Sequence, residues 1–132
     1  SGDHRDLPSI RSRHRQMCIR DSISRDIPAE ILYEDELCIV INDIAPQALV
    51  HMLVIPKQEI ARLVDAGQAD QPILGHLLLV AGEVARQFGV DDAFRLVVNN
   101  GADAGQTVFH LHLHILAGAK GSKEFLEADI GG

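Results

Sequence analysis

Three histidines alternate with apolar residues in one short segment, from His110 through His112 to His114. In a β-strand, successive side chains point to opposite faces, so an extended segment places the three imidazoles on one face and their apolar neighbours in the core. Three imidazoles on one face add nothing to packing. Each of them can act as nucleophile, acid, base or metal ligand near neutral pH. The spacing therefore predicts a chemical site.

A small polar loop comes directly before these histidines and contains Gly101, Gly105, Gln106 and Thr107. Backbone amides in a glycine-containing loop can converge on an anion and approach it closely. A loop of amide donors that leads into a row of histidines predicts a phosphate site with a nucleophile beside it.

These motifs resemble those of the histidine triad (HIT) family of nucleotide-binding proteins, whose histidines alternate with apolar residues in the same way. Residues 105–114 are similar to the branch of nucleoside phosphoramidases. Two further blocks, residues 42–57 and 27–35, follow the family pattern, and the likeness covers roughly residues 23–118. Three blocks in the family's order make the resemblance specific.

The resemblance implies catalysis through a covalent intermediate on the histidine face. His112 would attack a phosphorus atom and form a nucleotidyl-histidine that water then hydrolyses. His114 would donate to a phosphate oxygen, and His110 would support the other two from behind. His51 corresponds to a family histidine that packs against this cluster, although a half-buried strand histidine is an equally good interpretation.

The resemblance also implies a set of nucleotide-binding residues: Asp43, Ile44, Asn99, Gly105, Gln106 and Thr107. Asp43 would take the ribose hydroxyls, and Ile44 would form an apolar wall against the base. Asn99, Gln106 and Thr107 would donate to the phosphate and the leaving group. Residue physics alone makes Asp43 an ordinary turn residue, so its role depends on the resemblance.

The implied substrate is a purine nucleoside 5′-phosphoramidate, and the covalent step needs no metal or other cofactor. Diadenosine polyphosphate hydrolysis is the alternative activity. The chain departs from the family pattern at Glu59, at Leu49 and in a C-terminus without tryptophan. These departures affect the expected leaving group more than the core chemistry. Two other classes stay open: a nucleotide-binding module without turnover, and a zinc enzyme, because alternating histidines also suit a metal.

The composition is that of one globular domain, with 132 residues, 46% of them hydrophobic, and a net charge of −7. An acidic chain without a basic stripe excludes nucleic acid as the expected partner, and its apolar stretches are too short to span a membrane. Cys18 and Cys38 make no disulfide framework and no signal peptide is visible, so we expect a cytoplasmic protein. The family is dimeric, which implies a homodimer joined at the sheet edge near residues 94–99 and at the main helix.

Residues 1–21 look foreign to the rest of the chain. They carry five arginines and show neither a helical nor a strand period, and two peptides within them resemble translated sequencing adapters. We expect a non-native, disordered segment over 1–21 and a single HIT domain over 22–132. A natural basic tail is the competing interpretation.

The hydrophobic pattern predicts the elements that position these residues. Strands are expected over 32–33, 37–42, 50–55, 94–99 and 108–117, a short helix over 60–64 and a long helix over 72–88. The long helix carries a predicted buried stripe: Leu74, Leu77, Leu78, Ala81, Val84, Ala85 and Phe88. His76, near its start, is expected on the surface. The predicted class is α+β, an antiparallel sheet with one long and one short helix.

Overall fold

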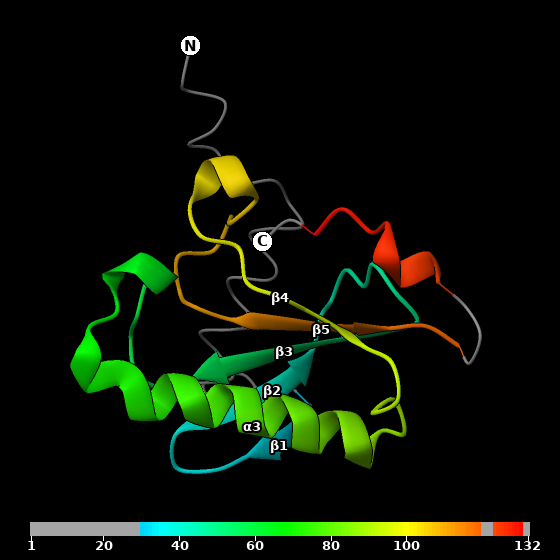
Figure 1. Cartoon of the computed structure of the whole chain (residues 1–132), viewed down its shortest axis with the longest axis horizontal. Coiled ribbons are helices and arrows are strands. Elements are labelled where there is room, and N and C mark those ends of the chain that lie inside the picture. The colour runs from blue at the N-terminus through cyan, green and yellow to red at the C-terminus, as the bar shows by residue number, and fades with distance from the viewer. Residues whose placement is uncertain (1–29, 120–122, 131–132) are drawn as a thin grey trace.

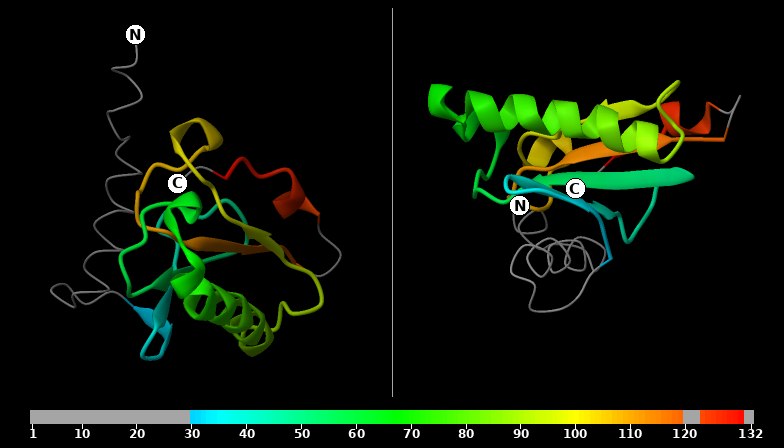
Figure 2. Two further views of the ribbon diagram at one scale, coloured as in Figure 1. Left: turned by 60° about the vertical axis from the view of Figure 1, so that its left-hand side comes forward. Right: turned by 90° about the horizontal axis from the view of Figure 1, so that it is seen from below.

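The computed structural model describes residues 30–119 and 123–130, and in these residues five strands form one antiparallel sheet of order β1–β2–β3–β5–β4 (Figure 1). The strands are β1 (Ile31–Glu34), β2 (Cys38–Asn42), β3 (Val50–Pro56), β4 (Arg95–Val97) and β5 (Leu113–Ala117). The long helix α3 (Gln71–Gln87) lies across one face of this sheet, as the view from below shows (Figure 2). The predicted α+β class and antiparallel sheet are confirmed.

Single turns of 3-10 helix complete the described elements. They are η1 (Leu63–Asp65), η2 (Gln68–Asp70), η3 (Ala102–Ala104) and η4 (Glu124–Leu126). The short helix predicted over 60–64 is therefore the 3-10 turn η1, which starts later than expected. Residues 1–21 and 27–29, on which two sequence predictions depend, lie outside the described residues. Among the described helices, none has the length and apolar character needed to cross a membrane.

The main core fills the space between α3 and the sheet. Met52 and Val54 of β3 and Leu113 and Ile115 of β5 point toward the helix, where Leu77 is fully buried among them. Each fully buried side chain of this size stabilises the fold by about 1.5–3 kcal/mol. Because strand residues alternate, the residues between them face the other way, on the side of the sheet that α3 leaves uncovered.

The prediction of a buried stripe on α3 is correct for Leu77, Ala81, Val84 and Ala85 and wrong for Leu78 and Phe88. The buried residues of α3 are Ile73, Leu77, Val80, Ala81, Val84 and Ala85. Leu78 is 57% exposed and Phe88 45% exposed, while Ile73 and Val80 replace them in the core. Three leucines in a row, from Leu77 to Leu79, cannot share one face, because each residue turns the helix by about 100°.

The strand predicted over 108–117 is wrong in its first half. β5 begins at Leu113, so His110 and His112 precede the sheet and His114 lies within it. The amide of Leu111 donates to the carbonyl of Ile60 at 2.7 Å. The segment therefore pairs with the chain that leaves β3 rather than with a neighbouring strand. Leu111 is still buried in the helix-side core, as the alternating pattern predicts.

Candidate active site

Three of the predicted histidines, His51, His112 and His114, lie together on the face of the sheet opposite α3. The ring centroids of His51 and His114 are 5.1 Å apart, and those of His112 and His114 are 5.0 Å apart. Antiparallel pairing of β3 with β5 produces this proximity, because Leu53 stands opposite His114 and His51 opposite Leu116. All three histidines are buried, with at most 4% of their surface exposed.

The hydrogen bonds of His51 determine which of its nitrogens carries a proton. The backbone amide of Gln47 donates to Nδ1 of His51 at 3.0 Å, so Nδ1 is an acceptor and the proton of His51 is on Nε2. This Nε2 lies 2.9 Å from Nδ1 of His114 and 3.3 Å from Oδ2 of Asp43. His51 therefore donates to His114, and the buried carboxylate of Asp43 stabilises the donating nitrogen.

Donation from His51 determines the protonation of His114 in turn. Because Nδ1 of His114 accepts a hydrogen bond, the proton of its neutral ring is on Nε2. His114 thus carries a hydrogen-bond donor at the nitrogen that points away from His51. A donor of this kind can stabilise negative charge on a phosphate oxygen.

His112 has the opposite tautomer. Its Nδ1 lies 2.6 Å from the backbone carbonyl oxygen of His110, and a carbonyl can only accept, so Nδ1 carries the proton. The lone pair of the neutral ring is consequently on Nε2. A neutral imidazole nitrogen with its lone pair in the ring plane is what nucleophilic attack on phosphorus requires. His114, whose ring lies next to that of His112, supplies the hydrogen-bond donor at its own Nε2.

His110 lies outside this group of rings and contributes one side-chain and one backbone hydrogen bond. Its Nε2 donates to the carbonyl of Pro56 at 2.8 Å, which fastens the segment before β5 to the end of β3. Its own carbonyl then orients His112. The structure therefore gives His110 a positioning contact on each side.

The loop before the histidines is shaped by two glycines and by the side chain of Gln106. Gly101 has a φ of 90° and Gly105 a φ of 100°, in the left-handed region that favours glycine. The buried Gln106 side chain accepts from the amide of Gly101 at 2.8 Å and donates to the carbonyls of Ala61 and Val108 at 2.8 and 3.1 Å. Gln106 thus holds the loop in shape, whereas Thr107 is exposed.

The remaining residues of the predicted nucleotide-binding set lie in different surroundings. Asp43 is buried, and its Oδ1 accepts from the amide of Ala45 at 2.8 Å, while Ile44 is 45% exposed. The side-chain amide of Asn99 donates to the carbonyl of Ile130 at 2.6 Å, which ties it to the C-terminal segment. The structure therefore brings Asp43 to the histidines and engages Asn99 elsewhere.

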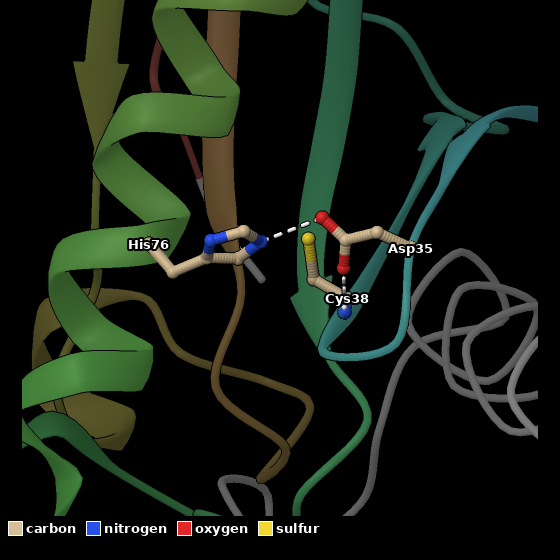
Figure 3. A group of neighbouring side chains, drawn as sticks. All are labelled: Asp35, Cys38 and His76. Atoms are coloured by element: carbon tan, nitrogen blue, oxygen red, sulfur yellow. Dashed lines mark hydrogen bonds and ion pairs between the residues drawn. The ribbon is translucent and has the colours of Figure 1, made fainter.

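Sequence analysis missed a second group of reactive side chains, which includes His76. This residue was expected on the surface, but it is half-buried and its Nε2 lies 2.6 Å from Oδ2 of Asp35 (Figure 3). Since 41 residues separate the two, no local spacing in the sequence indicates the contact. Cys38, fully buried, lies beside them.

Comparison with known proteins finds similarity to members of one family. A model of the HIT domain matches residues 24–121. An uncharacterized HIT-like protein of Synechocystis sp. is 59% identical over 96 residues, which cover 73% of this chain and 84% of the relative. A 14 kDa zinc-binding protein of Zea mays is 43% identical over 98 residues, covering 73% of this chain and 77% of the relative.

The fold is shared with solved members of the same family. A HIT family hydrolase from Clostridium thermocellum superposes with a TM-score of 0.73 at 42% sequence identity, over 80% of this chain and 91% of that chain. The chain therefore belongs to the HIT family, which confirms the resemblance found in its sequence motifs.

Proposed function

We propose that the protein is a HIT-type hydrolase that cleaves a purine nucleoside 5′-phosphoramidate through a nucleotidyl intermediate on His112. The observation that carries this proposal is the tautomer of His112: donation from Nδ1 to the carbonyl of His110 leaves the lone pair on Nε2. A solved relative is named a HIT family hydrolase, which supports hydrolysis as the class of reaction.

The reaction proceeds in two displacements at the α-phosphorus. Nε2 of His112 attacks phosphorus, the bond from phosphorus to the leaving nitrogen breaks, and the departing amine takes up a proton. Water then attacks the same phosphorus, the bond to Nε2 breaks, and a nucleoside monophosphate leaves. The Nε2 proton of His114 stabilises negative charge on the phosphate oxygens in both transition states.

The residues around the histidines have matching roles in this proposal. Asp43 takes the ribose hydroxyls and the exposed Ile44 lies against the base, as the family resemblance implies. Thr107 donates to the leaving group from its exposed position at the end of the loop. Gln106 acts through the loop that it holds in shape, and Asn99 reaches the phosphate only if it releases the carbonyl of Ile130.

A zinc enzyme is the second candidate, because Asp43, His51 and His114 each present one ligand atom within 4.8 Å of the others. All three side chains are buried, and a zinc ion held by them would need a further open position for water. A metal there would use Nε2 of His51 and would thereby break the hydrogen bond that sets the tautomer of His114.

One set of assays separates these functions. The purified protein is mixed in excess with labelled adenosine phosphoramidate, quenched early, and analysed for nucleotide attached to His112. We expect a trapped adduct, steady-state hydrolysis that EDTA leaves unchanged, and slower cleavage of a dinucleoside triphosphate. Activity that EDTA removes and zinc restores favours the zinc enzyme, and binding without any adduct or turnover favours a nucleotide-binding module.

We also propose that two copies of the chain associate through the β4 edge of the sheet and through α3. β4 ends the strand order, and an unpaired edge strand is a ready site for pairing with a second copy. Leu78 and Leu79 of α3 are 57% and 75% exposed, which supports an apolar contact there. Light scattering at micromolar concentration should give the mass of a dimer, and a monomeric mass would refute it. A cytoplasmic location stays a prediction from the sequence.

A further inference from the structure

A second cluster of metal-binding side chains lies on the helix side of the sheet, away from the histidine site. Asp35 comes from the turn between β1 and β2, Cys38 from the first position of β2, and His76 from α3 (Figure 3). One ligand atom from each of them lies within 4.8 Å of the other two. Cys38 belongs to the core between α3 and the sheet, whereas His51 faces the opposite side.

The carboxylate of Asp35 is held rigidly at the centre of this cluster. Its Oδ1 accepts from the amides of Leu37 and Cys38 at 2.8 and 2.9 Å, and its Oδ2 accepts from the hydroxyl of Tyr33 at 2.9 Å. The remaining contact of Oδ2 is the 2.6 Å hydrogen bond from His76. Three donors besides His76 therefore fix the carboxylate whether or not the histidine bonds to it.

We propose that Asp35, Cys38 and His76 form a binding site for a divalent transition metal ion of the zinc type. The donors are one carboxylate oxygen, one sulfur and one imidazole nitrogen. Thiolate and imidazole ligands select zinc over magnesium or calcium, which prefer oxygen ligands alone. The side chains of His76 and Asp35 are 30% and 24% exposed, so solvent reaches two of the three ligands.

Binding requires a small movement, a His76 ring with its proton on Nδ1, and the loss of the thiol proton of Cys38. Two ligands of one tetrahedral zinc at about 2.0–2.1 Å lie about 3.3 Å apart, and the oxygen and nitrogen of Asp35 and His76 are now 2.6 Å apart. The ion takes the place of the hydrogen between them, and the neutral imidazole of His76 binds it through the lone pair of Nε2, with its ring proton on Nδ1. The proton of the Cys38 thiol passes to solvent, which leaves a thiolate on the metal.

The neighbouring tyrosine acts as the outer contact of the site. The hydroxyl of Tyr33 donates to Oδ2 of Asp35, and metal-bound carboxylates commonly hold such a partner, which orients them. Tyr33 is the single tyrosine of the chain, which has no tryptophan. Its fluorescence therefore reports directly on events at this cluster.

Cobalt(II) is the probe of choice, because a thiolate ligand produces an ultraviolet charge-transfer band that histidine and carboxylate ligands do not. The full chain carries Cys18→Ser, so that Cys38 is its only cysteine. It is stripped with a chelator and titrated with Co²⁺ and then with Zn²⁺. We expect a band that saturates at one equivalent of Co²⁺, a parallel change in Tyr33 emission, displacement by Zn²⁺, and a melting temperature that rises with Zn²⁺.

Variants identify the ligands and separate this site from the histidine site. Cys38→Ala removes the thiolate but stays apolar in the core, and His76→Gln changes a half-buried residue, so both should fold. We expect each to abolish the band and the rise in melting temperature. The matched control His51→Gln, on the opposite face, should keep both, since it is not a ligand here.

Three outcomes overturn the proposal. They are a folded protein without a thiolate band at several equivalents of Co²⁺, a band that survives Cys38→Ala, and a band lost in the folded His51→Gln variant. The first would leave the 2.6 Å contact between His76 and Asp35 as an ordinary hydrogen bond. None of these results bears on hydrolysis at His112, so the site can fail while the proposed function holds.

Discussion

Nε2 of His51 lies 2.9 Å from Nδ1 of His114, although 63 residues separate them in the chain. The amide of Gln47 makes this contact directional, because it donates to the other nitrogen of His51. The backbone of the turn before β3 thereby determines which nitrogen of His114 carries a proton. In His112, by contrast, Nδ1 donates to the carbonyl of His110, so the lone pair of the His112 ring is on Nε2.

The first prediction concerns the nucleophile. His112→Ala should bind a nucleoside monophosphate with little change but hydrolyse the phosphoramidate on the order of 10³-fold or more slowly, because the covalent route is gone. Binding is measured by calorimetry and turnover by release of the amine. Hydrolysis at a rate near that of the wild type would remove His112 as the nucleophile.

The second prediction concerns His51 as a positioning residue. His51→Ala removes the donor to His114, whose proton is then no longer confined to Nε2. We expect a fall in kcat on the order of 10²-fold, with KM changed less, as for the loss of one aligned donor. The direct readout is the pair of imidazole ¹⁵N shifts of His114, which should indicate one tautomer in the wild type and a mixture in the variant. Unchanged shifts would show that His51 does not set the tautomer.

A third prediction separates the two polar residues that end the loop. Gln106→Ala removes three hydrogen bonds from a buried side chain and leaves Gly101 without its acceptor, so the free energy of unfolding should fall by about 1–3 kcal/mol. Thr107→Ala, at an exposed position, should leave unfolding unchanged within about 0.5 kcal/mol and lower kcat/KM instead. Urea denaturation measures the first effect. Equal stability of the two variants would contradict the structural role of Gln106.

The sheet and the family could be predicted from sequence because their determinants are local. The run from Val50 to Ile55 and the turn at Pro46 define the hairpin that the structure contains as β2 and β3. The alternating histidines and the loop before them are read from adjacent residues. Periodicity gives the type of each element well, and its ends less well.

The errors arise where a distant partner decides the structure. The segment containing His110 and His112 has the pattern of a strand, yet it bonds to Ile60 and Pro56 instead of continuing β5. His76 reads as a surface residue, since no neighbour in sequence predicts Asp35 as its partner. Contacts of this kind follow from tertiary packing, which a pattern in one segment does not contain.

The fourth prediction concerns acid stability. Although burial pushes the pKa of Asp35 upward, hydrogen bonds from His76, Tyr33 and two backbone amides hold this pKa below its ordinary value of 3.8. A lowered folded-state pKa means that the stabilisation is complete above the unfolded value and is lost as the pH falls through the folded one. Asp35→Asn should therefore cost about 2 kcal/mol at pH 7, and this difference should shrink below about pH 4.

The acid experiment compares urea denaturation of the wild type, Asp35→Asn and the exposed control Asp91→Asn between neutral pH and pH 3. The control should follow the wild type throughout. A difference between the wild type and Asp35→Asn that grows as the pH falls would reverse the predicted sign and remove the hydrogen bonds of Asp35 as its cause.

The last prediction uses the single tyrosine as a spectroscopic probe of Asp35. The hydrogen bond to Asp35, followed by burial and by the negative charge of that carboxylate, raises the pKa of Tyr33 from 10.0 to about 12. Because the folded-state pKa is raised, the stabilisation is complete below the unfolded value of 10.0 and is lost as the pH rises through about 12. The ultraviolet absorbance of tyrosinate should therefore appear near pH 12 in the native protein, and closer to 10.0 in Asp35→Asn. Far-ultraviolet circular dichroism is recorded on the same samples, since an unfolded chain would titrate at the ordinary value. Tyrosinate that forms near pH 10 while the helix signal is intact would show that Asp35 does not hold the hydroxyl proton.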